Sequence, residues 1–286
     1  DSALAAIAPA LVKRLQAIGL IGVYAEPDPA QLRVEEGLVI DARAAGHTGV
    51  TFQITTGTVT EVRTIGLGAR VPEDQTLNNP IHERIAANSP VRPVTADGGG
   101  PDLLRSDTID DFVMRLNRHP GRRVDVAVSA GGEEFGGVTL DYLVTENRPW
   151  LLFAQLANNG TSSTDEWRER FGFIHNQLTD HDDILSIEYL TAGFQDVHSV
   201  VTSYERPLGW DRLRGRVYGS WYEYTAGDVG QPDANFDGDG WSFGGEAIWN
   251  FLQRRETFLD LAAGLRWEGL NVDNEFSALS GQENLG

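Results

Sequence analysis

Residues 241–251 alternate between apolar and polar side chains, and this alternation constrains the fold more than any other feature of the sequence. Successive side chains of a β-strand point to opposite faces, so a strand over this segment has two different faces. One face carries Trp241, Phe243, Gly245, Ala247, Trp249 and Phe251, and the other carries Ser242, Gly244, Glu246, Ile248 and Asn250. An aromatic-ended apolar face opposite a polar face is typical of a transmembrane β-barrel strand.

Six further segments show the same alternation and predict an antiparallel β-barrel in residues 149–286. They span Trp150–Ala157, Trp167–Leu178, Ile184–Thr191, Val197–Glu205, Arg212–Tyr224 and Phe258–Leu270. Short turns alternate with longer loops between them, as in outer-membrane barrels. A soluble antiparallel sheet or sandwich alternates in the same way. Charged residues in the middle of the segments, with aromatic residues on the opposite face, favour the barrel.

The charged residues of the polar face are the predicted lining of a water-filled pore. They are Arg168, Arg170, Glu188, Arg214, Arg216, Glu246, Asp260 and Arg266. Seven strands cannot close a barrel, and an open edge in lipid leaves backbone groups unpaired at a cost of several kcal/mol each. We therefore expect residues 149–286 to be the N-terminal strands of a larger barrel.

Composition and motifs exclude several functions. The net charge of −19 disfavours nucleic acid, whose phosphates require a basic surface. The absence of cysteine excludes disulfides, thiol nucleophiles and thiolate metal sites. The sequence contains no run of eighteen apolar residues, so it predicts no transmembrane helix. There is no P-loop, dinucleotide fingerprint or Gly-x-Ser-x-Gly elbow, so we predict neither an enzyme nor a nucleotide-binding protein. The chain opens within a helical segment, Ala3–Ile18, so we expect a processed start or a fragment.

Residues 1–148 predict two small α+β modules, of which the first is partial. In the first module, residues 1–57, an apolar helical face runs through Ser2–Gly19 and a strand covers Gly49–Thr55. In the second, residues 58–148, the order is strand, helix, helix, strand, strand, with helices over one face of a small sheet. These elements are Thr58–Gly68, Asn79–Asn88, Pro101–Asn117, Arg123–Ser129 and Val138–Glu146.

The order of several motifs resembles the two-partner-secretion transporters of bacterial outer membranes. The stretch Leu116-Asn117-Arg118-His119-Pro120-Gly121 and the two strands after it resemble their last periplasmic module, the polypeptide-transport-associated (POTRA) domain. The segment after it resembles the start of their barrel. The residues that carry this likeness are Arg148-Pro149-Trp150, Asn158-Asn159-Gly160, Arg168, Phe171-Gly172, Asn176 and Asp182-Asp183. The likeness covers most of residues 50–270. It implies POTRA modules in the periplasm and a sixteen-stranded barrel in the outer membrane.

This resemblance implies a protein translocator of the haemolysin secretion and activation type. Its partners would be outer-membrane lipid and a secreted protein, which passes through the pore in extended form without nucleotide or cofactor. Because a sheet edge can accept an extended peptide as an extra strand, the predicted partner-binding residues are Val124, Val126 and Val128, with Phe112 and Leu116 on the neighbouring helix. Two alternatives stay open: a barrel-assembly factor of the same superfamily, and a surface-binding or adhesion protein with a soluble β-domain.

One loop resembles the opening of a calcium site. Asp233, Asn235, Asp237 and Asp239 alternate as hard oxygen donors around Gly238. The twelfth position of an EF-hand loop would be Gly244 instead of a bidentate glutamate, and no helices are predicted on either side. Calcium binding is therefore one reading of this loop, and a solvated outer loop is the other.

Overall fold

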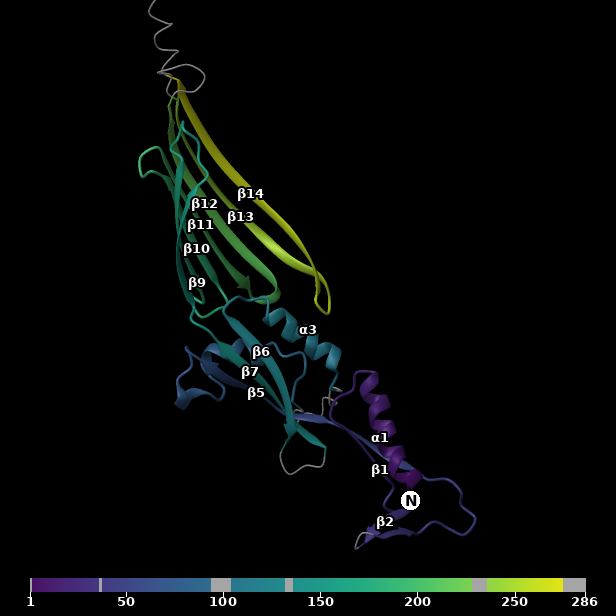
Figure 1. The fold of residues 1–286 in the computed structure, drawn as a ribbon. Helices are drawn as coiled ribbons and strands as arrows, with labels where there is room; N and C mark the ends of the chain where they lie inside the picture. Colours follow the sequence, from purple (N-terminus) through teal and green to yellow (C-terminus); the bar gives the residue numbers. More distant parts are fainter. Residues whose placement is uncertain (1, 36–37, 94–103, 132–135, 228–235, 275–286) are drawn as a thin grey trace, which may run out of the picture. The chain divides into compact units, whose positions relative to one another are not determined.

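The computed structural model describes residues 2–35, 38–93, 104–131, 136–227 and 236–274. The chain divides into two compact units, Asp1–Glu146 and Asn147–Gly286. Within the described residues, every helix lies in the first unit and the second unit consists of strands and their connections (Figure 1). The division falls next to residue 148, where the sequence predicts the change from α+β modules to barrel strands.

The N-terminal part of the first unit contains one helix and two short antiparallel strand pairs. Helix α1 (Ser2–Ala17) ends before Gly19, whose φ of +92° favours glycine. Strand β1 (Val23–Pro27) pairs with β4 (Phe52–Thr56), and β2 (Leu32–Glu35) pairs with β3 (Leu38–Asp41). The helix and its glycine stop lie where the apolar periodicity predicts them.

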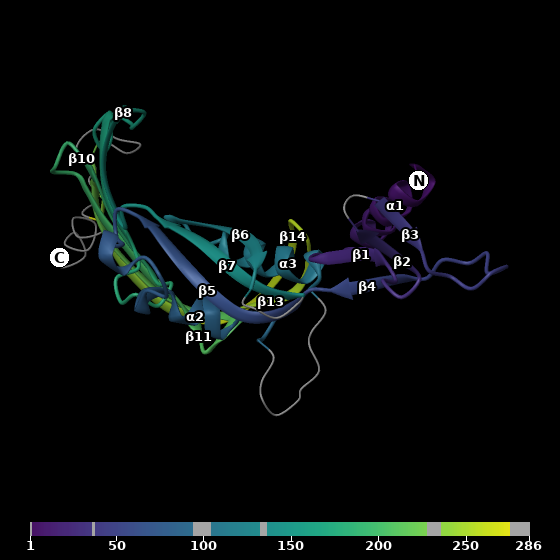
Figure 2. The same cartoon turned by 90° about the horizontal axis from the view of Figure 1, so that it is seen from below.

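The rest of the first unit has the predicted order of strand, helix, helix, strand, strand. Strand β5 (Thr58–Gly68) is followed by the 3-10 helices η1 (Glu73–Gln75) and η2 (Pro80–His82) and by α2 (Glu83–Ala87) and α3 (Ser106–Leu116). Strands β6 (Arg122–Ala130) and β7 (Gly137–Glu146) then complete a three-stranded sheet of order β5-β7-β6 (Figure 2). The last strand inserts between the other two, parallel to β5 and antiparallel to β6.

A single apolar core holds this sheet to α2 and α3. The helices contribute Ile85, Ile109 and Phe112, and Val91 and Leu104 come from the connections next to them. The strands contribute Val59, Val124, Val138, Leu140, Tyr142 and Val144. Phe112 and Tyr142 meet edge to face with ring centroids 5.6 Å apart. Strand β6 is an edge of the sheet, since β7 is its only neighbour in the strand order.

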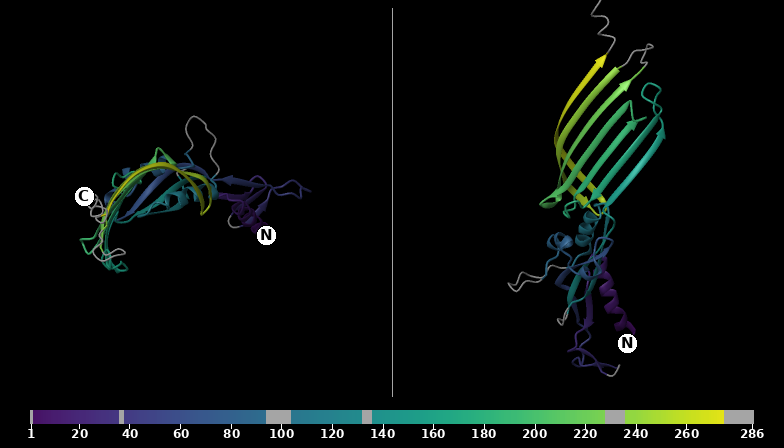
Figure 3. Two further views of the ribbon diagram at one scale, coloured as in Figure 1. Left: turned by 90° about the horizontal axis from the view of Figure 1, so that it is seen from above. Right: turned by 90° about the vertical axis from the view of Figure 1, so that its left-hand side faces the viewer.

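The second unit is one seven-stranded antiparallel sheet in which each strand pairs with the next in sequence. The strands are β8 (Trp150–Asn158), β9 (Trp167–Asn176), β10 (Ile184–Ala192), β11 (Val197–Leu208), β12 (Trp210–Ala226), β13 (Phe236–Arg254) and β14 (Thr257–Asn274). Figure 3 shows the strands side by side and the curvature of the sheet. All seven predicted strands are present, as the first part of a barrel requires.

The start of β13 differs from the prediction. The predicted strands Arg212–Tyr224 and 241–251 leave residues 225–240 between them as a polar loop, but β13 begins at Phe236 and pairs Phe236–Gly240 with Tyr222–Ala226 of β12. An Asp-Gly-Asp-Gly stretch is typical of a loop because glycine and aspartate are poor strand formers. Here the glycines are covered by tyrosines of β12, which replace the packing that glycine lacks.

Among the described residues, no helix combines the length and the apolar character that crossing a bilayer requires.

Candidate functional site

Strand register places all eight predicted pore-lining residues on one face of the seven-stranded sheet. Arg216 lies directly opposite Glu246 on β13 and Glu205 on β11, and Asp260 lies opposite Asn250. The same alternation extends across the sheet to Arg168 and Arg170, because directly paired residues share a face. We call this the charged face.

Ion pairs cross the strands of the charged face. Arg214 contacts Glu205 at 2.5 Å, and Arg216 lies 4.0 Å from Glu205 and also contacts Glu246. Arg170 contacts Glu188 on the next strand. These side chains are 17–42% exposed, so they are partly shielded but still reached by water. A continuous network of opposite charges therefore links β11, β12 and β13, and a separate pair links β9 and β10.

Glu205 is the functional candidate that the sequence analysis did not select. It lies at the end of the predicted strand Val197–Glu205, where the face of a side chain is hard to assign. In the structure β11 continues to Leu208, and Glu205 bridges two arginines of β12. The sequence does contain one signal for Glu205. It is a charged residue separated by an even number of positions from Val197 and Val201, and the strand register puts all three on the charged face.

The opposite face of the sheet is apolar and exposed. Its members are large apolar side chains that are exposed: Leu152, Trp167, Phe171, Trp221, Trp241, Phe243, Trp249, Leu261, Leu265 and Trp267. Trp221 and Trp241 are direct cross-strand neighbours. Each of these side chains is 38–68% exposed, and Leu265 is at the upper limit. A continuous patch of this kind is unfavourable in water and marks a protein or lipid interface.

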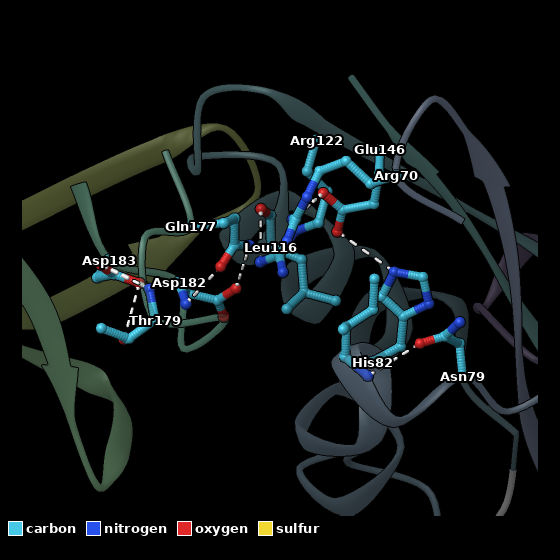
Figure 4. Close-up of polar contacts among 11 residues, drawn as sticks. Arg70, Asn79, His82, Leu116, Arg122, Glu146, Gln177, Thr179, Asp182 and Asp183 are labelled. Atoms are coloured by element: carbon cyan, nitrogen blue, oxygen red, sulfur yellow. Dashed lines mark hydrogen bonds and ion pairs between the residues drawn. The ribbon is translucent and has the colours of Figure 1, made fainter. Parts of the chain in front are cut away.

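Two predicted motif residues have local structural roles. Arg168 donates hydrogen bonds to the carbonyl of Thr164 at 2.8 Å and to its hydroxyl at 2.6 Å, so it fastens the loop between β8 and β9. The buried carboxylate of Asp183 accepts from the Thr179 amide at 3.0 Å and from its hydroxyl (Figure 4). Burial raises the Asp183 pKa, but these hydrogen bonds outweigh it and hold the pKa below its ordinary value. The Asp182-Asp183 motif thus closes the turn before β10.

The predicted partner-binding residues of the first unit divide into two groups. Phe112 and Val124 are fully buried in the core, so their side chains do not reach the surface. Leu116, Val126 and Val128 are half-buried and pack against that core. A role of these residues in partner binding stays a prediction, and for Val124 it would have to involve the backbone.

A buried charge cluster surrounds Glu146, the last residue of the first unit. Its carboxylate lies 3.1 Å from Arg70 Nη1 and 3.2 Å from His82 Nε2, and its side chain is 2% exposed (Figure 4). Burial raises the pKa of Glu146, but the His82 hydrogen bond and the charges of Arg122 and Arg70 outweigh it, so the pKa lies below its ordinary value. The cluster ties η2 and the segment after β5 to the end of β7. Sequence reasoning missed it because its members are far apart in the chain.

The calcium prediction falls partly outside the described residues, which do not include Asp233 and Asn235. Asp237 and Asp239 lie on β13 with exposed side chains. No group of three or more possible metal ligands occurs in the part of the chain that the structure describes. Calcium binding stays a prediction.

Comparisons with known proteins show a likeness to a family of bacterial secretion proteins. Residues 136–273, from the start of β7 to the end of β14, match the family described as haemolysin secretion/activation protein ShlB/FhaC/HecB. The match confirms the predicted resemblance to two-partner-secretion transporters and the predicted outer-membrane location. This is a family of secretion proteins and not a class of enzymes.

Solved structures show the same fold. CdiB from Escherichia coli matches with a TM-score of 0.61 at 13% identity, over 96% of this chain and 46% of that chain. CdiB from Acinetobacter baumannii matches with a TM-score of 0.53 at 14% identity, over 94% of this chain and 46% of that chain. The chain therefore spans less than half the length of these proteins. No curated protein sequence matches it.

Proposed function

We propose that the protein is an outer-membrane translocator that passes an unfolded secreted protein through the pore of its barrel. The observation that carries this proposal is the two-sided sheet within the region that matches the secretion family. One side is fit for contact with lipid, and the other carries charged residues on every strand from β9 to β14. Transport would use neither ATP nor another nucleotide.

The ion pairs of the charged face suit a pore wall. Partly exposed pairs such as Arg216 with Glu246 contribute modestly to stability, by about 0–1 kcal/mol for typical exposed pairs. Their larger effect is to keep the wall hydrated, because removing such charges from water costs several kcal/mol per ion. Because positive and negative side chains alternate along the wall, an unfolded polypeptide of either charge would not bind strongly at any one place. The wall therefore favours passage over binding.

Capture of the partner is proposed for the free edge of β6. The side chain of Asn117 accepts a hydrogen bond from the Val124 amide at 2.6 Å and donates one to the Val124 carbonyl at 2.9 Å. These two groups of Val124 thus point away from β7. Backbone direction alternates along an antiparallel strand, so Val126 and Val128 also direct their amide and carbonyl groups to the free edge. An extended segment of the partner would pair there as an added strand.

Asn117 gives the Leu116–Gly121 motif a physical role in this proposal. The side-chain amide of Asn117 binds the backbone amide and carbonyl of Val124 at the edge. The corresponding backbone groups of Val126 and Val128 stay available to an incoming strand. An added strand would therefore begin beyond Val124, in a register that Asn117 sets. Val124 itself serves the core through its fully buried side chain.

Gene deletion with complementation tests the translocation proposal. Cells that lack the full-length protein should lose one specific protein from the medium or cell surface and accumulate it in the periplasm. Complementation with the wild-type protein should restore its export. A general loss of many outer-membrane proteins would contradict secretion and support the barrel-assembly alternative. Unchanged exported and membrane proteins would contradict both.

A pair of variants tests capture at the β6 edge. Val128→Pro removes an amide that points to the free edge and keeps the bonds between β6 and β7. Val128→Ala keeps that amide and serves as the matched control. We expect export to fall strongly in Val128→Pro and to persist in Val128→Ala, with equal amounts of both proteins in the outer membrane. Equal export by the two variants would contradict capture at this edge.

A further inference from the structure

A row of glycines on β13 lies beneath tyrosines of β12 on the charged face. Tyr218 is directly opposite Gly244, Tyr222 is opposite Gly240, and Tyr224 is opposite Gly238. Between these pairs, Ser220 and Ser242 face each other with their hydroxyls 2.8 Å apart. Every second residue of this stretch of β13 is therefore glycine or serine. The row runs from the charged pair Arg216–Glu246 to the end of β12 that leads to residue 227.

The tyrosine rings occupy the space in which glycine side chains would stand. A Cβ atom at Gly240 would lie 2.6 Å from Tyr222 Cζ and 2.7 Å from its hydroxyl oxygen. A Cβ atom at Gly238 would lie 2.6 Å from Tyr224 Cζ, and one at Gly244 would lie 2.6 Å from Tyr218 Cζ. Distances below 3.0 Å are not found for real Cβ atoms. Each ring therefore lies along the wall, over its glycine.

The burial pattern of β13 agrees with this arrangement. Gly238, Gly240 and Gly244 are buried, while Asp237, Asp239 and Phe243 on the other face are exposed. Burial of a residue without a side chain requires cover from a neighbour, which the tyrosines provide. The same device occurs on this face at the other end of the sheet, where Phe153 of β8 covers Gly172 of β9 so closely that a Cβ atom would overlap its ring.

Sheet stability alone gives little reason for so many glycines. Glycine within a strand costs roughly 0.5–1 kcal/mol relative to alanine, although an aromatic neighbour recovers part of this cost. What glycine adds is room: a tyrosine that lies flat occupies far less of the pore than one that stands upright. The pattern thus combines bulky, amphipathic side chains with a thin wall.

We propose that this glycine row sets the bore of the pore by letting Tyr218, Tyr222 and Tyr224 lie flat against the wall. The rings then form a smooth track with apolar faces and polar hydroxyls, which suits an extended polypeptide of mixed composition. The proposal rests on the proposed function, because it requires that the charged face line a pore. It adds which residues determine how wide that pore is.

Channel conductance of the full-length protein in planar lipid bilayers tests the proposal. Gly240→Ala adds one carbon that meets only the Tyr222 side chain among its nearest atoms. We expect it to turn Tyr222 into the pore and to lower conductance by roughly a quarter or more. The double variant Gly240→Ala/Tyr222→Ser should recover at least the wild-type conductance, because the displaced ring is gone.

Gly245→Ala is the matched control on the same strand. A Cβ atom at Gly245 would lie 3.7 Å from the nearest neighbouring atom, which is ordinary contact, and it would project from the opposite face. We expect it to leave conductance unchanged. Heat-dependent gel mobility should show that all variants form the folded barrel before conductance is compared.

The outcomes separate the two proposals. A wild-type protein that forms no channel would overturn the pore itself, and with it this inference. A conducting wild-type protein with the same conductance in Gly240→Ala would overturn the role of the glycine row and leave the pore intact. Lower conductance that Tyr222→Ser does not restore would also overturn it, since the effect would then not pass through the ring.

Discussion

The two units of this chain place their large apolar side chains in opposite ways. In the first unit, residues such as Phe112, Leu140 and Tyr142 are fully buried between a small sheet and two helices. In the second unit, the buried apolar residues within the described range are only Ala192 and Ala226, and the large side chains lie exposed on one face. The same alternation of strand residues therefore serves two environments. The first unit buries its apolar face against its own helices, and the second leaves that face exposed, as the proposed contact with lipid requires.

The comparison explains why net hydrophobicity says little about location here. The second unit holds all seven tryptophans of the chain, yet it also carries charged residues on almost every strand. The first unit is less aromatic, yet it has the only extended buried core in the described residues. What distinguishes the units is whether the apolar face has a partner within the chain. This difference leads to the following predictions, in order of expected effect.

Truncation of the core aromatic should disrupt the first unit alone. Phe112→Ala removes a fully buried ring that packs on Tyr142, so it should lower the free energy of unfolding by about 3–5 kcal/mol. Circular dichroism at the helical minimum reports this unit, because the described helices lie in it. Tryptophan fluorescence reports the second unit and should not change. Parallel loss of both signals would contradict independent units.

A charge on the apolar face should disrupt the second unit in lipid. Leu265→Arg places a cation on the exposed apolar face of β14 and should cost about 2–4 kcal/mol if the position lies near the middle of the bilayer. Its neighbour Arg266 points to the charged face, so Arg266→Leu is the matched control and should cost much less. Urea titration of the barrel in lipid vesicles measures both. Equal costs would contradict the assignment of the faces.

Loss of the buried carboxylate should weaken the first unit in a pH-dependent way. Glu146→Gln removes the charge that His82 and Arg70 contact, at a cost of about 1.5–3 kcal/mol near neutral pH. The pKa of Glu146 is lowered in the folded state, so its stabilisation is present above the ordinary carboxyl pKa and is lost as pH falls through the lower folded value. The difference between wild type and variant should therefore shrink under acid conditions.

The control for that prediction is Glu61→Gln. Glu61 is 54% exposed and lies 3.8 Å from Arg63, so its loss should change thermal unfolding little at any pH. A difference between wild type and Glu146→Gln that stays constant from neutral to acid pH would contradict the proposed role of the Glu146 charge.

The smallest effect is expected at an exposed ion pair of β6. Arg123 lies 3.0 Å from Asp125, and their side chains are 75% and 56% exposed. Water and salt screen such a pair, so Arg123→Ala should leave the melting temperature of the first unit within experimental error. A clear loss of stability would mean that β6 depends on its surface charges and not only on its buried face.

Period-two alternation predicted the second unit well, because a strand has only two faces. Once the strands are recognised, the odd or even residue number of Arg170, Glu188 and Arg216 tells on which face of the sheet each one lies. Glu205 and the first residues of β13 were missed for local reasons. Glu205 lies where the predicted strand stops, and Gly238 and Gly240 look like loop residues until Tyr222 and Tyr224 are placed over them.

The first unit was predicted in outline but not in its long-range contacts. Helical periodicity identified Phe112 as an apolar-face residue, yet it does not tell whether that face meets the core or a partner; the structure buries it. The insertion of β7 between β5 and β6 and the contact of His82 with Glu146 join residues distant in sequence. Such contacts depend on the tertiary arrangement, which no local pattern encodes.

The most direct test is to measure whether each face of β13 is in contact with water or with lipid. The chain has no cysteine, so single cysteines can be placed at each position from Trp241 to Phe251 of the full-length protein without background labelling. Membranes are then treated with a water-soluble or a lipid-soluble maleimide. We expect aqueous labelling at Ser242, Glu246 and Asn250, and labelling from lipid alone at Phe243, Ala247 and Trp249. Uniform aqueous labelling, or recovery of the protein in the soluble fraction, would contradict it.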